Sequence, residues 1–577
     1  MKKITLNNIN NKKYTFLTKN NYSLLKLTNE ITIISRNEYQ RRIIEANIFN
    51  LEKLLDFLKR NIEYGIYIIC LSNSMLVFNS FLGTELSYYD TGSQLYISDS
   101  SLTIAEKLNL KLSKEAISTY LIAGLPYFPF YTMSLWKNIN KLPALKYLKI
   151  TEQGDLLFID VSLSSDNFHK NKTPSEIKET FIKKINTDIS DHKEITLDIS
   201  GGIDSAVIAY LLNDTTSIYS TFHSYSNENS DTEWAKFIAN DLGKTLNILE
   251  SIGSNNNRFE VDSEFLGGNI PDSPLLWGDT EGYVLNLVKN FSNNKHFKNL
   301  HFIGIGGDDL FSPMPSAPWS IAKNNGLKGF EFLIKYSIFS RSSFIICLRS
   351  FFERTRYFDD LTNKISGAFI NSTPKKKLLF SWNEEIIIPS WLTQNIKENL
   401  YSSLIKVANE YKEPLNNDRA KNQEIQSLIF QNNILSQLNI LSPESIYWSA
   451  PYLNSDVIEN SFFLSEFEKY NPTTLKPFLK KMMNGIMPEE LFYRGSKGDY
   501  STTLYESYRL AKKKYNGNFK DFELFKLGII DLEILEQELS MPTANSIRID
   551  FFEKLCNMER WLRQLKRYSG ELYEKNF

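Results

Sequence analysis

The 577-residue sequence predicts an α/β protein with two parts: a β-rich N-terminal part and a larger C-terminal part built on a doubly wound parallel sheet. Two observations predict this fold class. Short apolar runs separated by tight polar turns fill the first 160 residues. From residue 174 onward, strand-like and helix-like segments alternate, which is typical of a parallel sheet with helices on its faces. We therefore expect two domains, residues 1–165 and 170–577.

Hairpins are expected in the N-terminal part. Each is a pair of apolar runs around a short polar turn, and the pairs are residues 67–71 with 75–79, 86–89 with 94–97, and 146–150 with 156–161. A helix is expected over residues 115–122.

A polar stretch, residues 162–175, marks the predicted boundary. Helices and strands should then alternate over residues 174–187, 194–199, 205–212, 217–223, 231–242 and 246–250. From about residue 314 the pattern is mostly helical, and we expect a helical insertion over about 315–440.

Composition excludes several classes of protein. The chain has 66 Lys and Arg against 67 Asp and Glu, so a global nucleic-acid footprint is not expected. Three cysteines and five histidines give neither a disulfide framework nor a zinc site. The N-terminus lacks the apolar core of a signal peptide, and no apolar run reaches the roughly 18 residues of a membrane span. We therefore expect a cytoplasmic protein with no nucleic-acid or membrane partner.

A phosphate-binding loop is predicted where the strand at 194–199 runs into a helix through Ser-Gly-Gly-Ile-Asp-Ser. Glycines let the backbone approach a ligand closely, and the free N–H groups of a helix start attract anions. An aspartate in such a loop is expected to hold a metal that neutralises phosphate. The alternative is a plain strand-to-helix turn capped by serine, but the whole pattern favours phosphate. The predicted residues are Ile199, Ser200, Gly201, Gly202, Asp204 and Ser205.

A second glycine-rich turn follows the strand-like residues 301–303, with Gly304, Gly306 and Asp308. Alone it could be a solvated turn. Because strand ends of one parallel sheet face the same crevice, Asp308 and Asp204 together predict a Mg²⁺ site. Phe222, near the end of the neighbouring strand, fits an adenine contact and a plain core residue equally well.

Together with residues 451–454, a Met-Pro at 487–488 and an Arg-x-x-Lys segment at 494–497, these loops resemble the asparagine synthetase family, which includes β-lactam synthetases and lasso-peptide cyclases. The resemblance implies that ATP is cleaved to AMP and pyrophosphate. It implies catalytic roles for Lys497 and Asp308, and nucleotide binding by the residues named above.

The N-terminal part resembles the family's glutamine-amidotransferase αββα sandwich through residues 88–89, 96–100 and 135–143. Lys2 stands where glutamine-dependent members carry a nucleophilic Cys, which implies that the amine is already on the substrate. Ile305 stands where relatives often carry Glu or Tyr, so the general base is not assigned.

Residues 124–131 and 388–392 resemble the lasso-peptide cyclases in particular. The resemblance implies macrolactam formation, in which an Asp or Glu side chain of a peptide is adenylated and then attacked by the peptide's N-terminal amine. The implied partners are a precursor peptide, a leader peptidase and a leader-binding protein. The insertion at 315–440 either walls a peptide cavity or is an ordinary helical subdomain. Two alternative functions remain: a small-molecule amide or β-lactam-type synthetase, and a catalytically inactive scaffold of a peptide-processing complex.

Overall fold

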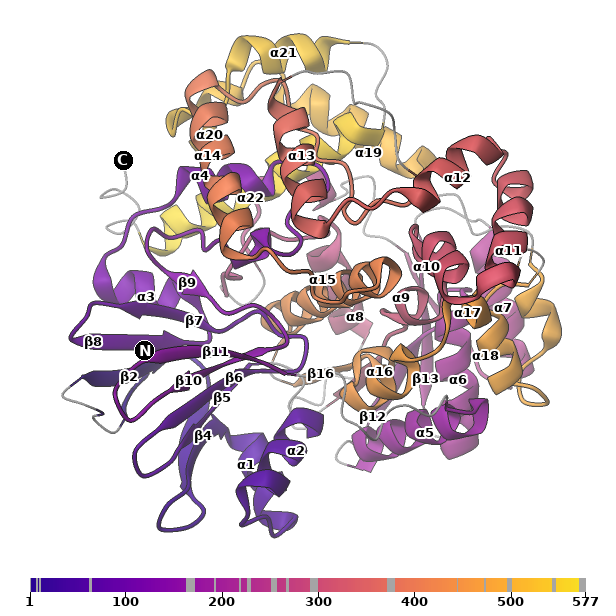
Figure 1. Cartoon of the computed structure of the whole chain (residues 1–577), viewed down its shortest axis with the longest axis horizontal. Coiled ribbons are helices and arrows are strands. Elements are labelled where there is room, and N and C mark those ends of the chain that lie inside the picture. The colour runs from indigo at the N-terminus through magenta and orange to yellow at the C-terminus, as the bar shows by residue number, and fades with distance from the viewer. Residues whose placement is uncertain are drawn as a thin grey trace.

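The computed structural model has a β-rich N-terminal part beside a larger α/β part (Figure 1). The structure describes residues 2–6, 9, 12–61, 65–161, 172–190, 194–216, 219–225, 230–250, 257–265, 269–290, 299–370, 379–443, 445–471, 474–494, 501–541 and 546–569. Most of the predicted domain boundary lies outside these residues, and so does Lys497.

The N-terminal part contains two sheets packed face to face. One sheet runs, in spatial order, β1 (Lys2–Thr5), β2 (Lys13–Thr18), β8 (Gln94–Ser98), β7 (Ser87–Asp90) and β9 (Asn140–Lys141). The other runs β11 (Leu156–Asp160), β10 (Lys146–Ile150), β6 (Met75–Asn79), β5 (Ile66–Cys70), β4 (Thr32–Arg36) and β3 (Tyr22–Lys26). The predicted hairpins are confirmed as the antiparallel pairs β5–β6, β7–β8 and β10–β11.

Helices cover the outer faces of these sheets. Ile68 points into the core between the sheets, whereas its neighbour Ile69 packs with Ile43 of α1 (Asn37–Glu45) and Leu54 of α2 (Leu51–Asn61). Successive strand side chains alternate between faces, which explains why β5 and β6 are buried throughout. On the far side α3 (Ser101–Leu108) contacts β2, β7 and β8. The layers are therefore helix, sheet, sheet, helix, and the short helix α4 (Lys114–Tyr120) leads away from them.

The larger part is built on a parallel sheet, as predicted. Its spatial order is β14 (Leu246–Glu250), β13 (Ser220–Tyr225), β12 (Glu194–Asp198), β15 (Asn299–Phe302) and β16 (Ile446–Ser449), and every pairing is parallel. The strand order reverses between β12 and β15, and a ligand crevice is expected at such a switch point. The sequence analysis did not foresee β16.

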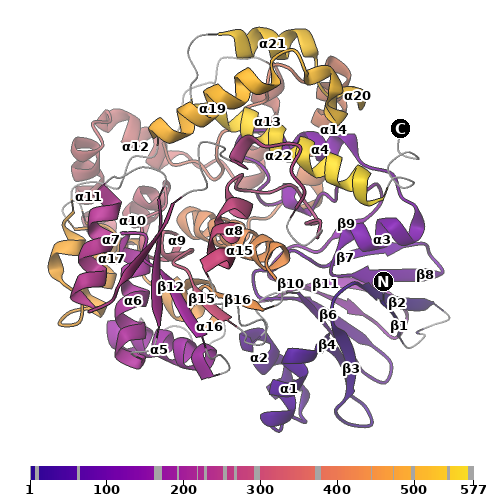
Figure 2. The ribbon, with the colours of Figure 1, turned by 180° about the vertical axis from the view of Figure 1, so that it is seen from behind.

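Helices cover both faces of the parallel sheet. Figures 1 and 2 show α6 (Ile203–Thr215) and α7 (Ser230–Asp241) on one side, and α8 (Thr280–Asn290) with α15 (Arg419–Leu441) on the other. The helix α5 (Pro174–Ser190) packs on α6, and α9 (Gly307–Phe311) follows β15. Since α6 starts at Ile203, Asp204 belongs to the first helical turn and not to the preceding loop, where the sequence analysis placed it.

The remainder is helical, as expected beyond residue 314. The helices are α10 (Ala317–Asn324), α11 (Gly326–Phe339), α12 (Phe344–Phe352), α13 (Tyr357–Ile370), α14 (Gln394–Glu410), α16 (Ser455–Phe462), α17 (Glu466–Lys469), α18 (Pro477–Met482), α19 (Ser501–Tyr515), α20 (Glu523–Lys526), α21 (Leu532–Ser540) and α22 (Ser546–Tyr568). Within the described ranges, no helix is both long and apolar enough to span a membrane.

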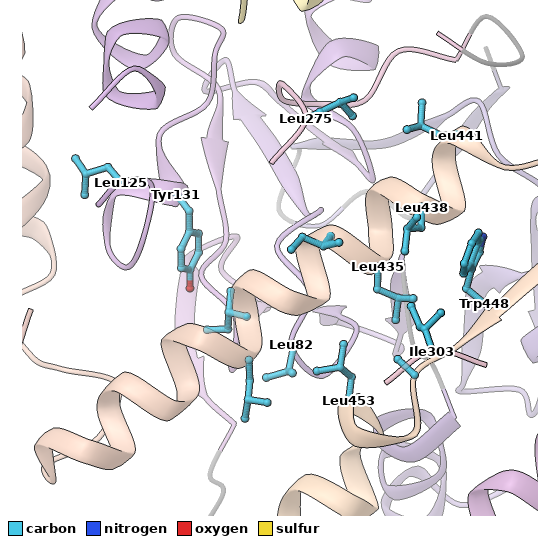
Figure 3. Packing of buried hydrophobic residues seen from close by; sticks show 14 of the residues in the cluster. Leu82, Leu125, Tyr131, Leu275, Ile303, Leu435, Leu438, Leu441, Trp448 and Leu453 are labelled. Carbon is cyan, nitrogen blue, oxygen red and sulfur yellow. The ribbon is translucent and has the colours of Figure 1, made fainter. Parts of the chain in front are cut away.

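The helix α15 lies where the two parts meet. Leu435 and Leu438 of this helix belong to the same buried cluster as Trp448 of β16 and Leu82 of the N-terminal part (Figure 3). On the same helix, Asn433 accepts a hydrogen bond of 2.7 Å from the Thr84 hydroxyl. The two parts therefore share a buried hydrophobic cluster, which is separate from the core between the two N-terminal sheets.

Asp272 makes a second connection between the parts. It lies in the segment before α8, and its carboxylate accepts hydrogen bonds from the Leu102 backbone N–H (3.0 Å) and from the hydroxyls of Ser100 (3.0 Å) and Ser101 (2.8 Å). It thereby caps α3 of the N-terminal part. The ammonium of the buried Lys141 lies 3.2 Å from the other carboxylate oxygen.

Candidate functional site

The loop between β12 and α6 is closed by its own serines. The Ser200 N–H donates to Ser205 Oγ (3.1 Å), and the Gly202 N–H donates to Ser200 Oγ (3.2 Å). Gly201 has φ = +84°, and a Cβ on it would lie 2.1 Å from the carbonyl oxygen of Asp231. Gly202 is the N-cap of α6 and has no side chain to cap the helix. An anion is therefore favoured at the start of α6, where the N-cap residue Gly202 offers no side chain to the N–H groups of the first turn.

The second glycine-rich turn packs directly against the first. A Cβ on Gly304 would lie 2.9 Å from the backbone nitrogen of Ser205, and one on Gly307 would lie 2.3 Å from Cγ of Asp204. Gly306 has φ = +90°, which a side chain would strain. The turn thus depends on glycine at each of these positions, and the two predicted loops form one site.

Asp204, in the first turn of α6, and Asp308, in α9, converge on one ammonium group. Lys476 Nζ lies 2.8 Å from Asp308 Oδ1 and also pairs with Asp204 Oδ1. The Lys476 side chain is only 7% exposed, whereas that of Asp308 is 53% exposed. Lys476 stands immediately before α18 with φ = +47°. The sequence analysis did not assign Lys476 to the site.

These two carboxylates fit a magnesium ion shared with phosphate. They are hard oxygen donors directed at one point, and Mg²⁺ in nucleotide sites commonly uses one or two carboxylates with phosphate oxygens and water. A site with three or more acidic, His or Cys ligands is absent from the residues that the structure describes. The two carboxylates make the position between them favourable for a cation, and in the structure the Lys476 ammonium pairs with both.

Tyr452 makes a hydrogen bond to the first turn of α6. Its hydroxyl donates a hydrogen bond of 3.1 Å to the backbone oxygen of Asp204. Burial, and then the negative charges of Asp204 and Asp308, raise the pKa of Tyr452 well above its ordinary value. The phenol therefore stays protonated and remains a donor.

Arg494 ties a distant segment to the first loop. Its Nη1 donates to the Gly201 carbonyl (2.5 Å) and to Asp231 Oδ1 (3.1 Å), and the residue is 7% exposed. Lys497 follows three positions later, in residues 495–500, outside the described residues. Arg494, the last described residue before that segment, is thus fixed to the loop between β12 and α6.

The other predicted residues lie around the two loops. The Ile199 N–H donates to the backbone oxygen of Phe222 (2.7 Å). The Phe222 ring is buried and lies 6.4 Å, centroid to centroid, from the ring of His301. Ile305 is partly exposed between the two glycines of the second turn.

Asp309 is directed away from Asp308. Its carboxylate is buried and accepts a hydrogen bond from the Ser427 hydroxyl of α15. Burial is the main cause that raises the pKa of Asp309; the Ser427 hydrogen bond opposes it, and the charge of Asp308 adds to it. Of the paired acids in this turn, Asp308 is the one directed at Lys476.

Comparisons with known proteins give a family and one relative. A model of the asparagine synthase family matches residues 176–565. The chain is 25% identical over 302 residues to the microcin J25-processing protein McjC of Escherichia coli, a match that covers 50% of this chain and 53% of that protein. The chain thus spans about half the length of the curated relative it matches. Among solved structures, an NH3-dependent NAD synthetase from Campylobacter jejuni, in complex with nitrate, matches 42% of this chain and 98% of its own at 15% identity and a TM-score of 0.19.

Proposed function

Because the chain belongs to the asparagine synthase family, as its glycine-rich loops predicted, we propose that it forms an amide bond in a reaction that converts ATP to AMP and pyrophosphate. The main support is the convergence of Asp204 and Asp308 on Lys476, beside the uncapped start of α6.

ATP binds along the two loops in this proposal. Ser200, Gly201, Gly202 and Ser205 surround the β and γ phosphates, which accept hydrogen bonds from the N–H groups of the first turn of α6 and from the serine hydroxyls. Ile199, Phe222, Gly304 and Gly306 line the nucleotide site. Asp204 and Asp308 hold Mg²⁺, which when bound neutralises phosphate charge.

The chemistry has two steps. A substrate carboxylate oxygen attacks the α phosphorus, the bond to the β-phosphate bridging oxygen breaks, and an acyl-adenylate and pyrophosphate form. An amine nitrogen then attacks the acyl carbon, loses a proton, and expels AMP. Lys497 stabilises the charge that develops in both steps, a role for which a fixed ammonium in a water-poor site is well suited. Lys476, between Asp204 and Asp308, keeps these two carboxylates close together without mutual repulsion.

The proposed substrate is a ribosomal lasso-type precursor peptide. The activated carboxylate is an Asp or Glu side chain, and the amine is the peptide's new N-terminus, so the product is a macrolactam held by an isopeptide bond. Similarity to a microcin J25-processing protein supports a peptide substrate. A leader peptidase and a leader-binding protein are the proposed partners, and the cytoplasm, which supplies ATP, is the proposed location. Both ends of the reacting chain are on one molecule, so holding them together favours ring closure.

In this proposal residues 1–165 form a domain of the amidotransferase type without its nucleophile, and residues 170–577 form the synthetase domain with an insertion over about 315–440. The helix–sheet–sheet–helix layers of the N-terminal part support the first assignment.

The test is a product analysis with the full chain, precursor peptide, leader peptidase, ATP and Mg²⁺. We expect AMP and pyrophosphate by chromatography, and a peptide lighter by one water by mass spectrometry. ADP and phosphate would overturn the adenylation step. AMP formed with small carboxylates and amines, but not with the peptide, would identify a small-molecule amide synthetase. Peptide binding without nucleotide turnover would identify a scaffold.

A further inference from the structure

Exposed apolar side chains gather on the two neighbouring helices α11 and α12. Between residues 327 and 352 the exposed large apolar side chains are Leu327, Phe330, Ile334, Ile338, Ile345, Ile346 and Phe352. Leu327 is 91% exposed, Ile345 76% and Ile338 70%. Single exposed apolar residues are normal on protein surfaces, but a contiguous group of this kind indicates an interaction surface.

The spacing of these residues places them on one face of each helix. On α11 the positions 327, 330, 334 and 338 recur at helical intervals, so they form one stripe. The opposite face of α11 is anchored: Leu333 is fully buried with Phe380, and the Phe332 ring lies 4.8 Å from that of Tyr470.

The helix α12 runs beside this stripe and extends the surface. The rings of Phe330 and Phe344 are 6.0 Å apart and join the two helices. Figure 1 shows α11 and α12 at the periphery of the molecule, far from the N-terminal sheets. The exposed stripe thus belongs to a well-anchored helical hairpin.

Most exposed charged side chains of the same segment are basic. Over residues 323–356 the exposed charged residues are Lys323, Lys328, Lys335, Arg341, Arg349, Arg354 and Arg356, against one exposed acid, Glu331. The whole chain has a formal net charge of −1, so this basic excess is local. A protruding apolar stripe flanked by Lys and Arg is the pattern of helices that lie in the interface of an anionic membrane.

We propose that α11 and α12 form a docking surface for an anionic lipid membrane, with the apolar stripe inserted among the acyl chains and the basic residues at the headgroups. The exposed side chains belong to a helical hairpin at the periphery of the molecule, which suits insertion into lipid better than the capture of a peptide in a groove. The sequence analysis expected no membrane partner because no apolar run is long enough to span a bilayer. A helix that lies on the surface needs no such run, so the length of apolar runs does not test this proposal.

The test is flotation of the full chain with vesicles of phosphatidylcholine and phosphatidylglycerol, and with vesicles of phosphatidylcholine alone. We expect the wild type to float with the anionic vesicles and to be released as salt rises. The double variant Ile338→Ser/Ile345→Ser should lower the partition coefficient by about tenfold or more. Lys335→Gln and Arg349→Gln should each lower it by about fivefold.

A matched control is Leu24→Ser/Phe49→Ser, which removes two exposed apolar residues of the N-terminal part (54% and 61% exposed) and should float as the wild type does. The proposal fails if the wild type does not float with anionic vesicles, or if the α11–α12 variants float equally well. It also fails if the wild type is instead a dimer by sedimentation that Ile338→Ser/Ile345→Ser dissociates, because a second copy would then occupy the stripe.

Discussion

At the residue scale, Lys476 is the group on which the two acidic loops depend. Its ammonium pairs with Asp204 and Asp308, and its side chain is almost fully buried. We expect Lys476→Met to lower amide formation by on the order of 10²-fold, the scale for one preorganised charged group. Because the lysine no longer competes for the two carboxylates, the variant should bind Mg²⁺ more tightly. The two effects are measured by following the rate of amide formation and the melting temperature over a range of Mg²⁺ concentrations.

Lys480→Met is the matched control. Lys480 lies one helical turn further along α18 and pairs with Glu489 (3.0 Å), and the Glu489 side chain is 64% exposed. This surface pair contributes little to stability, so Lys480→Met should match the wild type in turnover, in thermal melting and in its response to Mg²⁺. A wild-type rate and an unchanged Mg²⁺ response in Lys476→Met would remove Lys476 from the site.

The sequence predicted the acids of the site but not the lysine. Asp204 and Asp308 each follow a strand and a glycine pair, so the local pattern indicates a phosphate loop. Lys476 lies 272 positions from Asp204, and only the folded chain brings the two together. Arg494 belongs to the Arg-x-x-Lys segment of the sequence, but its hydrogen bond to the Gly201 carbonyl is likewise a tertiary contact that no local pattern encodes.

At the element scale, the turn from β12 into α6 depends on Gly201. An alanine there must adopt a positive φ, and its Cβ would overlap the backbone at the start of α7. We expect Gly201→Ala to lower the free energy of unfolding by about 2 kcal/mol more than the same substitution does at a positive-φ glycine that has no close neighbour. Gly243, with φ = +63° and nothing within 4 Å of an added Cβ, provides that comparison.

Urea unfolding of Gly201→Ala and Gly243→Ala isolates the effect of the close approach, since both variants bear the positive-φ strain. Equal destabilisation of the two would contradict the tight contact between the β12–α6 loop and α7.

Element types were predictable where the chain has a regular pattern. The strands β5, β6, β12 and β14 and the helices α5 and α7 begin within a residue or two of their predicted positions. The strand β16 was missed because Ile446–Ser449 is only four residues long and stands in a mostly helical stretch, where its pairing with β15 identifies it. The predicted start of α6, residue 205, is later than the observed start at Ile203, because the glycine pair gives no helical pattern that marks the first turn.

At the scale of the whole molecule, Asp272 and Lys141 connect the two parts. Asp272→Asn leaves a buried ammonium without its counter-charge, so we expect the free energy of unfolding to fall by about 3 kcal/mol. Asp90→Asn, which breaks the more exposed pair of Lys12 and Asp90 within the N-terminal part, should change it by less than about 1 kcal/mol.

The pair of Asp272 and Lys141 also predicts that the stability of the protein depends on pH. Burial alone would raise the pKa of Asp272, but the charge of Lys141 and hydrogen bonds from Leu102 and Ser101 bring the pKa below its ordinary value. A lowered folded-state pKa gives stabilisation that is present above the unfolded-state pKa of about 3.9 and is lost as pH falls through the folded-state pKa. The difference in stability between the wild type and Asp272→Asn should therefore shrink below about pH 4, and an unchanged difference there would contradict this origin.

The buried cluster that the two parts share could not be predicted from the sequence, for a physical reason. The helix α15 buries side chains around its circumference, including the polar Asn422, Glu424, Asn432 and Gln437, so no amphipathic stripe reveals which elements it contacts. The division into a β-rich part and a parallel-sheet part follows from local patterns, whereas the way these parts pack depends on contacts such as that of Thr84 with Asn433.

This junction also limits how genes of this kind can recombine. A chimaera that takes its first 160 residues from one parent and the rest from another must match Asp272 with the start of α3, and α15 with the surface around Leu82 and Thr84. A crossover at the boundary separates these partners, so productive exchanges are those in which both sides of the junction come from the same parent.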